Sequence, residues 1–354
     1  MGRYPGKFLP FLVFPVMEER PTKSNLLLES FPEQQLLLSV TPSPLHHTPG
    51  AGSLTYTLRP SPPTRLYTLL KDSEWTQWGP TLATVSDYFR YLRTPQASCR
   101  KLLKLGGSYC IGELVVNGVD MDGHKYVCMD PALEVVGAKV PQDCLTLSFG
   151  TQYDTTFDDA VSELPCEVHM FDVINFNPQL ARETEHVHFH VEGLSDRNIA
   201  KYFIRMNTTF RFDNLQGLVM KNQLFPRPIH VLKVDIENDE WEAFRDIAQN
   251  PLLDAVGQVA LEVHVADLVY PKKLPRERWL GLLQERYDVL RMIEARGFRR
   301  VVYWDNTRGP HHLYDKDGTK YETAGELLYV NTNWYNASFK RQLATYGFKF
   351  RQMD

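Results

Sequence analysis

The sequence lacks an excess of charge of either sign: 39 Lys and Arg residues stand against 43 Asp and Glu residues, and the net charge is -4. With a pI near 6.3, the chain has no broad positive field that would attract phosphate backbones or anionic lipids. Nucleic acid is therefore not expected as a partner. A hydrophobic content of 43% is ordinary for a soluble globular protein and excludes disorder over most of the length.

The five cysteines include no CxxC pair, which removes the usual signatures of zinc ribbons and of thioredoxin-like redox sites. Cys99 and Cys128 flank a loop-rich segment and could pair, but their spacing does not decide it. Cys144 and Cys166 fall within apolar, strand-like runs, where we expect buried free thiols.

Residues 1–75 contain nearly half of the 23 prolines. Because proline fixes φ and removes a backbone donor, we expect a flexible tail without sustained helices or central strands. Its apolar run, Phe8–Val16, is shorter than the roughly 20 residues that span a bilayer. The run resembles a degenerate signal peptide or signal anchor, which favours the secretory pathway, with a cytoplasmic location as the alternative.

Residues 76–135 predict a module of two short helices and a hairpin, packed against the main domain. The first helix lies between Thr81 and Pro95 and the second covers Ser98–Leu105, ending at a pair of glycines. The segment Met121–His124 is typical of a hairpin turn that would join residues 113–116 to Lys125–Cys128.

Residues 136–354 alternate strand and helix patterns, which predicts a doubly wound, mostly parallel α/β sheet covered by helices on both faces. Several amphipathic helices fall between the strands, the longest from Pro275 to Arg296. The expected strands are Asp143–Phe149, Glu167–Phe171, Val187–Val191, His230–Ile236, Gln258–Val265, Phe298–Trp304 and Glu326–Val330.

Ligands of such sheets bind beyond the carboxyl ends of the strands, so the residues that follow each strand are the candidates. Phe149 and Gly150 end the first strand, and the glycine allows a bound cofactor to approach the backbone. Asp172 ends the second strand, about 20 residues after Gly150, a position suited to the ribose hydroxyls of an adenosine. Asp196, after the third strand, is a candidate partner for an adenine amino group. The absence of a G-x-G-x-x-G loop argues against a pyrophosphate and hence against a nicotinamide-dependent dehydrogenase.

Charged side chains in the two following strands suggest where the reaction takes place. Asp235 and Glu237 share one face of the fourth strand, and Glu262 and His264 share one face of the fifth. Buried parallel strands are normally apolar, so these groups either line a polar cleft, lie on edge strands or neutralise one another. In a cleft, His264 or a carboxylate would act as general base toward an acceptor hydroxyl, or the carboxylates would hold a divalent metal.

Three histidines, His186, His188 and His190, alternate along the third strand and share one face. Same-face positions on a strand are about 6.6–7 Å apart, too far for one ion to reach all three. We therefore interpret them as a polar surface and assign no metal ligand to this strand.

Several segments of the chain, taken in order, resemble the animal methyltransferase-like proteins of the vertebrate methyltransferase-like 24 type. These proteins are related to the FkbM-type methyltransferases. The segments that carry the resemblance are Asp122–Asp130, Leu147–Gly150, Phe171–Asp172, Leu232–Glu237 and Leu261–His264. The resemblance implies a Rossmann-like, seven-stranded class I methyltransferase fold in which Glu326–Val330 is the last, antiparallel strand. It also implies S-adenosylmethionine as cofactor and a secreted or membrane-anchored protein.

The function expected from the sequence is O-methyl transfer from S-adenosylmethionine to a glycan or a small metabolite. The alternative is a catalytically inactive domain of the same fold that binds a protein. The sequence does not determine the oligomeric state.

Overall fold

The computed structural model describes residues 78–109, 121–135, 143–152, 154–173, 185–203, 207–225, 227–270, 273–307 and 311–334. The expected proline-rich tail, the run Phe8–Val16 and residues 113–116 lie outside these ranges. No described helix is both long and apolar enough to cross a membrane.

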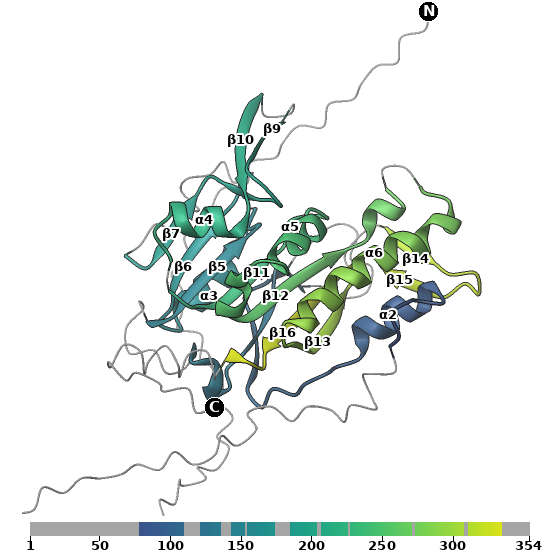
Figure 1. Ribbon diagram of the computed structural model, residues 1–354, viewed down its shortest axis with the longest axis horizontal. Coiled ribbons are helices and arrows are strands. Elements are labelled where there is room, and N and C mark those ends of the chain that lie inside the picture. The colour runs from purple at the N-terminus through teal and green to yellow at the C-terminus, as the bar shows by residue number, and fades with distance from the viewer. Residues whose placement is uncertain are drawn as a thin grey trace, which may run out of the picture. The chain divides into compact units, whose positions relative to one another are not determined.

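A seven-stranded sheet forms the centre of the domain, in the order β13-β16-β12-β11-β5-β6-β7 (Figure 1). Only β16 runs antiparallel to its neighbours; the other six strands share one direction. All seven expected strands are confirmed, and so is the Rossmann-like class I methyltransferase fold. The strands are β5 (Leu145–Phe149), β6 (Glu167–Phe171), β7 (Val187–His190), β11 (Ile229–Val234), β12 (Val256–His264), β13 (Phe298–Asn306) and β16 (Ala324–Asn331).

Two hydrophobic clusters cover the two faces of this sheet. One face packs against the apolar sides of four helices, α2 (Val85–Arg93), α4 (Leu215–Lys221), α5 (Glu240–Ile247) and α6 (Arg276–Ala295). The other packs against α3 (Thr156–Ser162) and against β4 (Lys125–Cys128). The sheet is therefore buried on both sides, as the apolar strands β5 and β12 require.

The helix expected at Ser98–Leu105 is wrong, because Leu102–Leu105 forms strand β1. It pairs antiparallel with β4, so β1 is the described strand partner of Lys125–Cys128, while the expected partner at residues 113–116 lies outside the described residues. Leu102 and Leu103 are both partly exposed, at 36% and 39%. A short apolar run of this kind fits either a helix or a strand, since its length gives no clear period.

Short elements complete the domain. A separate sheet, ordered β8-β10-β9, is inserted between β7 and α4, and its apolar side packs on Val173. Its strands are β8 (Gly193–Leu194), β9 (Ile199–Phe203) and β10 (Thr208–Asp213). Two further strand pairs are described, β2 (Ser108–Tyr109) with β3 (Met121–Asp122) and β14 (His312–Tyr314) with β15 (Lys320–Glu322). The described residues also include 3-10 turns at Pro131–Leu133, Pro251–Ala255 and Ala266–Leu268.

Cys144 and Cys166 form a disulfide, so the expectation of two free thiols is wrong. The reason lies in the register: Leu145 pairs with Glu167, which places the residues just before β5 and β6 side by side. Their Cα atoms are 4.5 Å apart. The second disulfide joins Cys99 to Cys128, the pair that the sequence had left undecided.

We expect the C144A/C166A variant to lose about 3 kcal/mol of unfolding free energy, because its unfolded chain is no longer closed into a loop of some 20 residues. Urea unfolding monitored by circular dichroism measures this difference. A loss below about 0.5 kcal/mol, the scatter expected of neutral surface changes, would contradict a formed disulfide.

Candidate functional site

Gly150 occupies the turn at the carboxyl end of β5, and only glycine fits there. Its φ is +80°, and a Cβ atom would lie 1.6 Å from the carbonyl oxygen of Asp235. The N–H of Gly150 donates to the carbonyl oxygen of Phe171 at 3.0 Å, and the carbonyl oxygen of Gly150 accepts from the ammonium of Lys233. The turn is thus held between the ends of β6 and β11.

Asp172 follows β6 and is joined to the same turn. Its carboxylate accepts a hydrogen bond from the N–H of Gln152 at 2.5 Å, and the residue is 5% exposed. The structure therefore brings Gly150 and Asp172 together. A backbone turn without a Cβ beside an acidic strand end suits the chemistry of an adenosine, whose ribose offers hydroxyl donors.

Two other residues were expected to contact the cofactor. The side chain of Phe149, directly before Gly150, is fully buried and stacks on Phe171, with ring centroids 4.7 Å apart. Asp196 follows β8, where it accepts from Ser195 and pairs with Arg197 at 3.1 Å. Among the described residues, no hydrogen bond or ion pair joins Asp196 to the Gly150 turn.

The reacting end of the site is organised by Lys125, a residue that sequence reasoning missed. Its side chain is completely buried, and its ammonium donates to three carboxylates. The distances are 3.0 Å to Asp235, 3.1 Å to Glu262 and 2.7 Å to Glu326. Asp235 and Glu262 thus converge on one side of the sheet.

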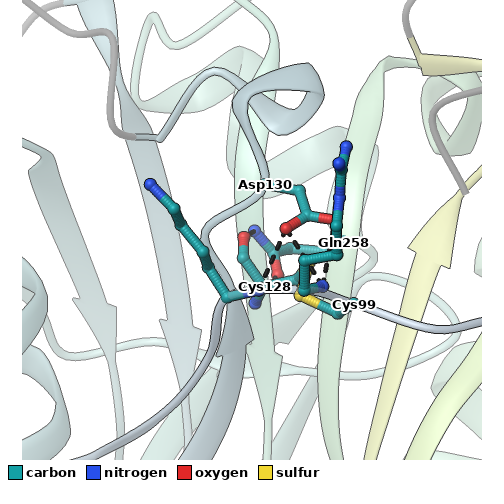
Figure 2. Close-up of a disulfide and its surroundings, with 6 residues drawn as sticks. Cys99, Cys128, Asp130 and Gln258 are labelled. Carbon is teal, nitrogen blue, oxygen red and sulfur yellow. Dashed lines mark hydrogen bonds between the residues drawn. A yellow bond between two sulfur atoms is a disulfide. The ribbon is translucent and has the colours of Figure 1, made fainter. Parts of the chain in front are cut away.

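Lys125 reaches this position because β4 packs on one face of the sheet. There Gln258 of β12 holds Cys128, the last residue of β4 (Figure 2). The buried side-chain amide of Gln258 accepts from the N–H of Cys128 at 2.8 Å and donates to the carbonyl oxygen of Cys128 at 3.2 Å. The disulfide from Cys128 to Cys99 and the hydrogen bonds from the N–H groups of Arg100 and Lys101 to Asp130 tie β4 to the start of β1.

Charges in this cluster perturb one another strongly. Burial alone would lower the pKa of Lys125, but its three carboxylate partners outweigh burial and raise it well above the usual value. Burial would raise the pKa of Asp235, yet Lys125 and Lys233 hold it below the usual range. Burial and the charge of Glu262 raise the pKa of Glu326. One buried ammonium therefore lies among carboxylates whose pKa values are shifted in opposite directions, downward for Asp235 and upward for Glu326.

His264, at the end of β12, forms a second charged group next to the first. Its Nδ1 lies 3.2 Å from the buried carboxylate of Glu240, which also accepts from the His264 N–H at 2.8 Å. Burial alone would lower the pKa of His264, but the hydrogen bond to Glu240 and the surrounding carboxylates raise it to about 10. His264 is therefore an imidazolium at neutral pH and has no free lone pair with which to accept a proton.

Glu237 is the carboxylate of this group that stays accessible. Its side chain is 63% exposed and lies 3.7 Å from Nε2 of His264. Partial burial and repulsion from Asp235 raise its pKa, although the charge of His264 opposes this. Glu237 and Asn238 both have positive φ, 56° and 80°, which for residues other than glycine costs about 1–3 kcal/mol each. The chain therefore holds Glu237 at the strand end at an energetic cost.

The sequence left three explanations for the charged residues of β11 and β12: a polar cleft, edge strands or mutual neutralisation. The second is wrong, since both strands lie inside the sheet. Mutual neutralisation applies to Asp235 and Glu262, which share Lys125. Glu237 remains outside that arrangement. One oxygen from each of Asp235 and Glu237 and a nitrogen of His264 also lie within 4.8 Å of one another, close enough to hold an ion. An ion there would have to compete with Lys125 for Asp235 and with a proton for His264.

Comparisons with known proteins agree with this geometry. A family model described as a methyltransferase domain matches residues 88–291. "Probable methyltransferase-like protein 24" of Homo sapiens is 22% identical over 248 residues, which are 70% of this chain and 64% of that protein. The protein of the same name from Rattus norvegicus is 22% identical over 209 residues, 59% of this chain and 56% of that protein. The chain thus matches less than two thirds of the length of either relative, and the resemblance found in the sequence is confirmed.

Proposed function

The chain belongs to the methyltransferase-domain family, whose model matches more than half of it, and from this premise we propose that it is an S-adenosylmethionine-dependent O-methyltransferase. The acceptor that we propose is a hydroxyl of a glycan or of a small metabolite. The observation that carries the proposal is the convergence of Asp235, Glu262 and His264 at the strand ends that adjoin Gly150 and Asp172.

In the proposed mechanism, Asp172 accepts hydrogen bonds from the ribose hydroxyls, and the Gly150 turn allows the nucleoside to lie against the backbone. S-adenosylmethionine supplies an electrophilic methyl group on a sulfonium. Asp196 is kept as the proposed partner of the adenine amino group, although it lies in the inserted sheet.

Glu237 is the proposed general base. Its carboxylate takes the proton of the acceptor hydroxyl while the new oxygen–methyl bond forms and the sulfonium–methyl bond breaks. Asp235 and Glu262, held by Lys125, would form a fixed polar wall of the site without taking part in proton transfer. A divalent metal bound by Asp235, Glu237 and His264 is the alternative way to activate the hydroxyl.

The alternative of an inactive, protein-binding domain is less well supported. It would gain support if Asp235 and Glu262 lay on opposite faces of the sheet, but Lys125 contacts both from one side. The strained backbone at Glu237 points in the same direction, because strain of this kind is typical of functional sites.

Cofactor binding can be tested with the D172N variant. Because asparagine keeps an oxygen for the Gln152 N–H but lacks the charge, we expect S-adenosylhomocysteine to bind about 10–100-fold more weakly, the loss of 1.5–3 kcal/mol typical of a charged hydrogen bond. Isothermal titration calorimetry of S-adenosylhomocysteine with the wild type and the variant measures it.

E242Q is the matched control, since Glu242 is an exposed carboxylate on α5, and its affinity should equal that of the wild type. If the folded wild-type protein binds neither S-adenosylmethionine nor S-adenosylhomocysteine, the proposed function is wrong. If D172N binds as tightly as the wild type, Asp172 is not the ribose partner.

We also propose that the protein works in the secretory pathway, either secreted or anchored in the membrane. The disulfides Cys99–Cys128 and Cys144–Cys166 support this, because such bonds persist mainly in oxidising compartments. Peptide mapping without reductant, on protein isolated from cells, provides the test. Free thiols at all four positions would favour the cytoplasm.

A further inference from the structure

A second group of potential ligands lies away from the candidate site, where β6 meets the edge strand β7. His169 of β6 is the register partner of His188 of β7, and their rings stack with centroids 4.6 Å apart. Glu167, two residues before His169, points to the same face of the sheet. From the sequence we expected only a polar surface here, because the three histidines considered lie along one strand. The neighbouring strand β6 adds Glu167 and His169 as possible ligands.

The distances within this group are close to those of a metal site. Oε1 of Glu167 lies 2.8 Å from Nε2 of His169 and 3.9 Å from Nε2 of His188. One ligand atom from each residue falls within 4.8 Å of the other two. In a tetrahedral site with metal–ligand bonds of 2.0–2.1 Å, ligand atoms are about 3.3 Å apart. Each of the two Glu167–histidine distances is therefore within about 0.6 Å of the value expected in a coordination shell.

The groups around the cluster would hold the ligands in place. Nδ1 of His169 lies 2.9 Å from Nε2 of His190, so a hydrogen bond there leaves Nε2 of His169 facing Glu167. Arg227 donates to Oε1 of Glu167 at 3.0 Å, the oxygen that also faces the two imidazoles, so an ion would either share Oε1 with Arg227 or bind Oε2. Partners of this kind are the usual second layer of histidine and carboxylate metal sites.

We propose that Glu167, His169 and His188 bind a zinc ion. Two imidazoles and one carboxylate suit Zn²⁺, whereas Ca²⁺ and Mg²⁺ prefer oxygen ligands alone. The side chain of His188 is 39% exposed, so solvent can enter and a water can fill the fourth position. The ion would join the first half of β6 to the edge strand β7. This inference does not depend on the proposed methyl transfer.

Zinc titration of the full-length, untagged protein in competition with a chromogenic chelator tests the proposal. We expect the wild type to bind one equivalent of Zn²⁺ that H188A binds at least 10-fold more weakly. Excess Zn²⁺ should raise the unfolding temperature of the wild type and leave that of H188A unchanged. X-ray absorption should show only nitrogen and oxygen ligands, including two imidazoles.

H312A is the matched control, because His312 is a partly exposed histidine with a glutamate partner, Glu322 at 2.8 Å. Its zinc affinity should equal that of the wild type. H264N separates the two candidate sites: if it loses the ion and H188A retains it, the zinc belongs to the Asp235 group and the proposal is wrong. No zinc binding by folded wild type, or equal binding by H188A, would also overturn it. Failure here leaves the cofactor titration unaffected.

Discussion

Replacing Lys125 with methionine is expected to lower the free energy of unfolding by about 3–5 kcal/mol, the usual effect of removing one partner from a buried ion pair. The variant keeps the length of the side chain but leaves Asp235 and Glu262 without their shared cation. Both carboxylates are largely buried, so water does not replace the lost charge. Urea unfolding at pH 7 measures the difference.

K101M serves as the control, because Lys101 is exposed and lies just before β1; we expect a change within about 0.5 kcal/mol. K125M should regain stability as the pH falls, because without the ammonium burial raises the pKa of Asp235 and the folded state then takes up a proton. If K125M is as stable as K101M at pH 7, the ammonium does not hold the carboxylates together, and the description of the site is wrong.

The second large effect concerns pH and His264. The pKa of His264 is raised from 6.5 to about 10 in the folded protein, so the folded state holds this proton more tightly than the unfolded chain does. Its contribution to stability is fully present below pH 6.5 and is lost as the pH rises through 10. A difference of 3.5 pKa values corresponds to at most about 5 kcal/mol.

We therefore expect the wild-type protein to lose stability between pH 6.5 and 10, and H264N to lose much less over the same interval. Urea unfolding of both proteins at several pH values gives the slopes. H312A is the comparison, since His312 has one carboxylate partner and stays more exposed. Parallel slopes for the wild type and H264N would show that Glu240 does not hold a proton on His264.

The sequence predicted the sheet well because its strands are runs of mostly apolar residues that alternate with amphipathic helices. Every described position of β5 and β12 is buried, and such runs stand out against the helices between them. Gly150 and Asp172 were also found correctly as neighbours, since their place at strand ends follows from the topology alone.

Long-range partners were the part that the sequence could not supply. Lys125 looked like the first residue of an ordinary hairpin strand, and only the packing of β4 across the sheet brings it to three carboxylates. The same holds for Cys144 and Cys166, whose apolar neighbours suggested free thiols. Their equivalent positions before two adjacent parallel strands were a usable signal, because neighbouring strands in register place such residues together.

The proposed base, too, follows from contacts that the sequence does not show. His264 was one of several candidates in the sequence, but its contact with Glu240 explains why it stays protonated. Glu237 is left as the accessible carboxylate, and its backbone conformation gives no warning in the sequence, since positive φ is rare for glutamate.

Transfer of a radiolabelled methyl group from S-adenosylmethionine to pools of glycans and small hydroxyl metabolites tests the central claim most directly, with wild type, E237Q and E242Q compared at pH 7. We predict labelled product with the wild type and with E242Q, and a rate about 10²–10⁴-fold lower with E237Q, the usual loss when a general base is removed. Equal rates for wild type and E237Q would contradict the assignment of Glu237. A wild-type protein that binds no cofactor and labels no acceptor would contradict the function itself.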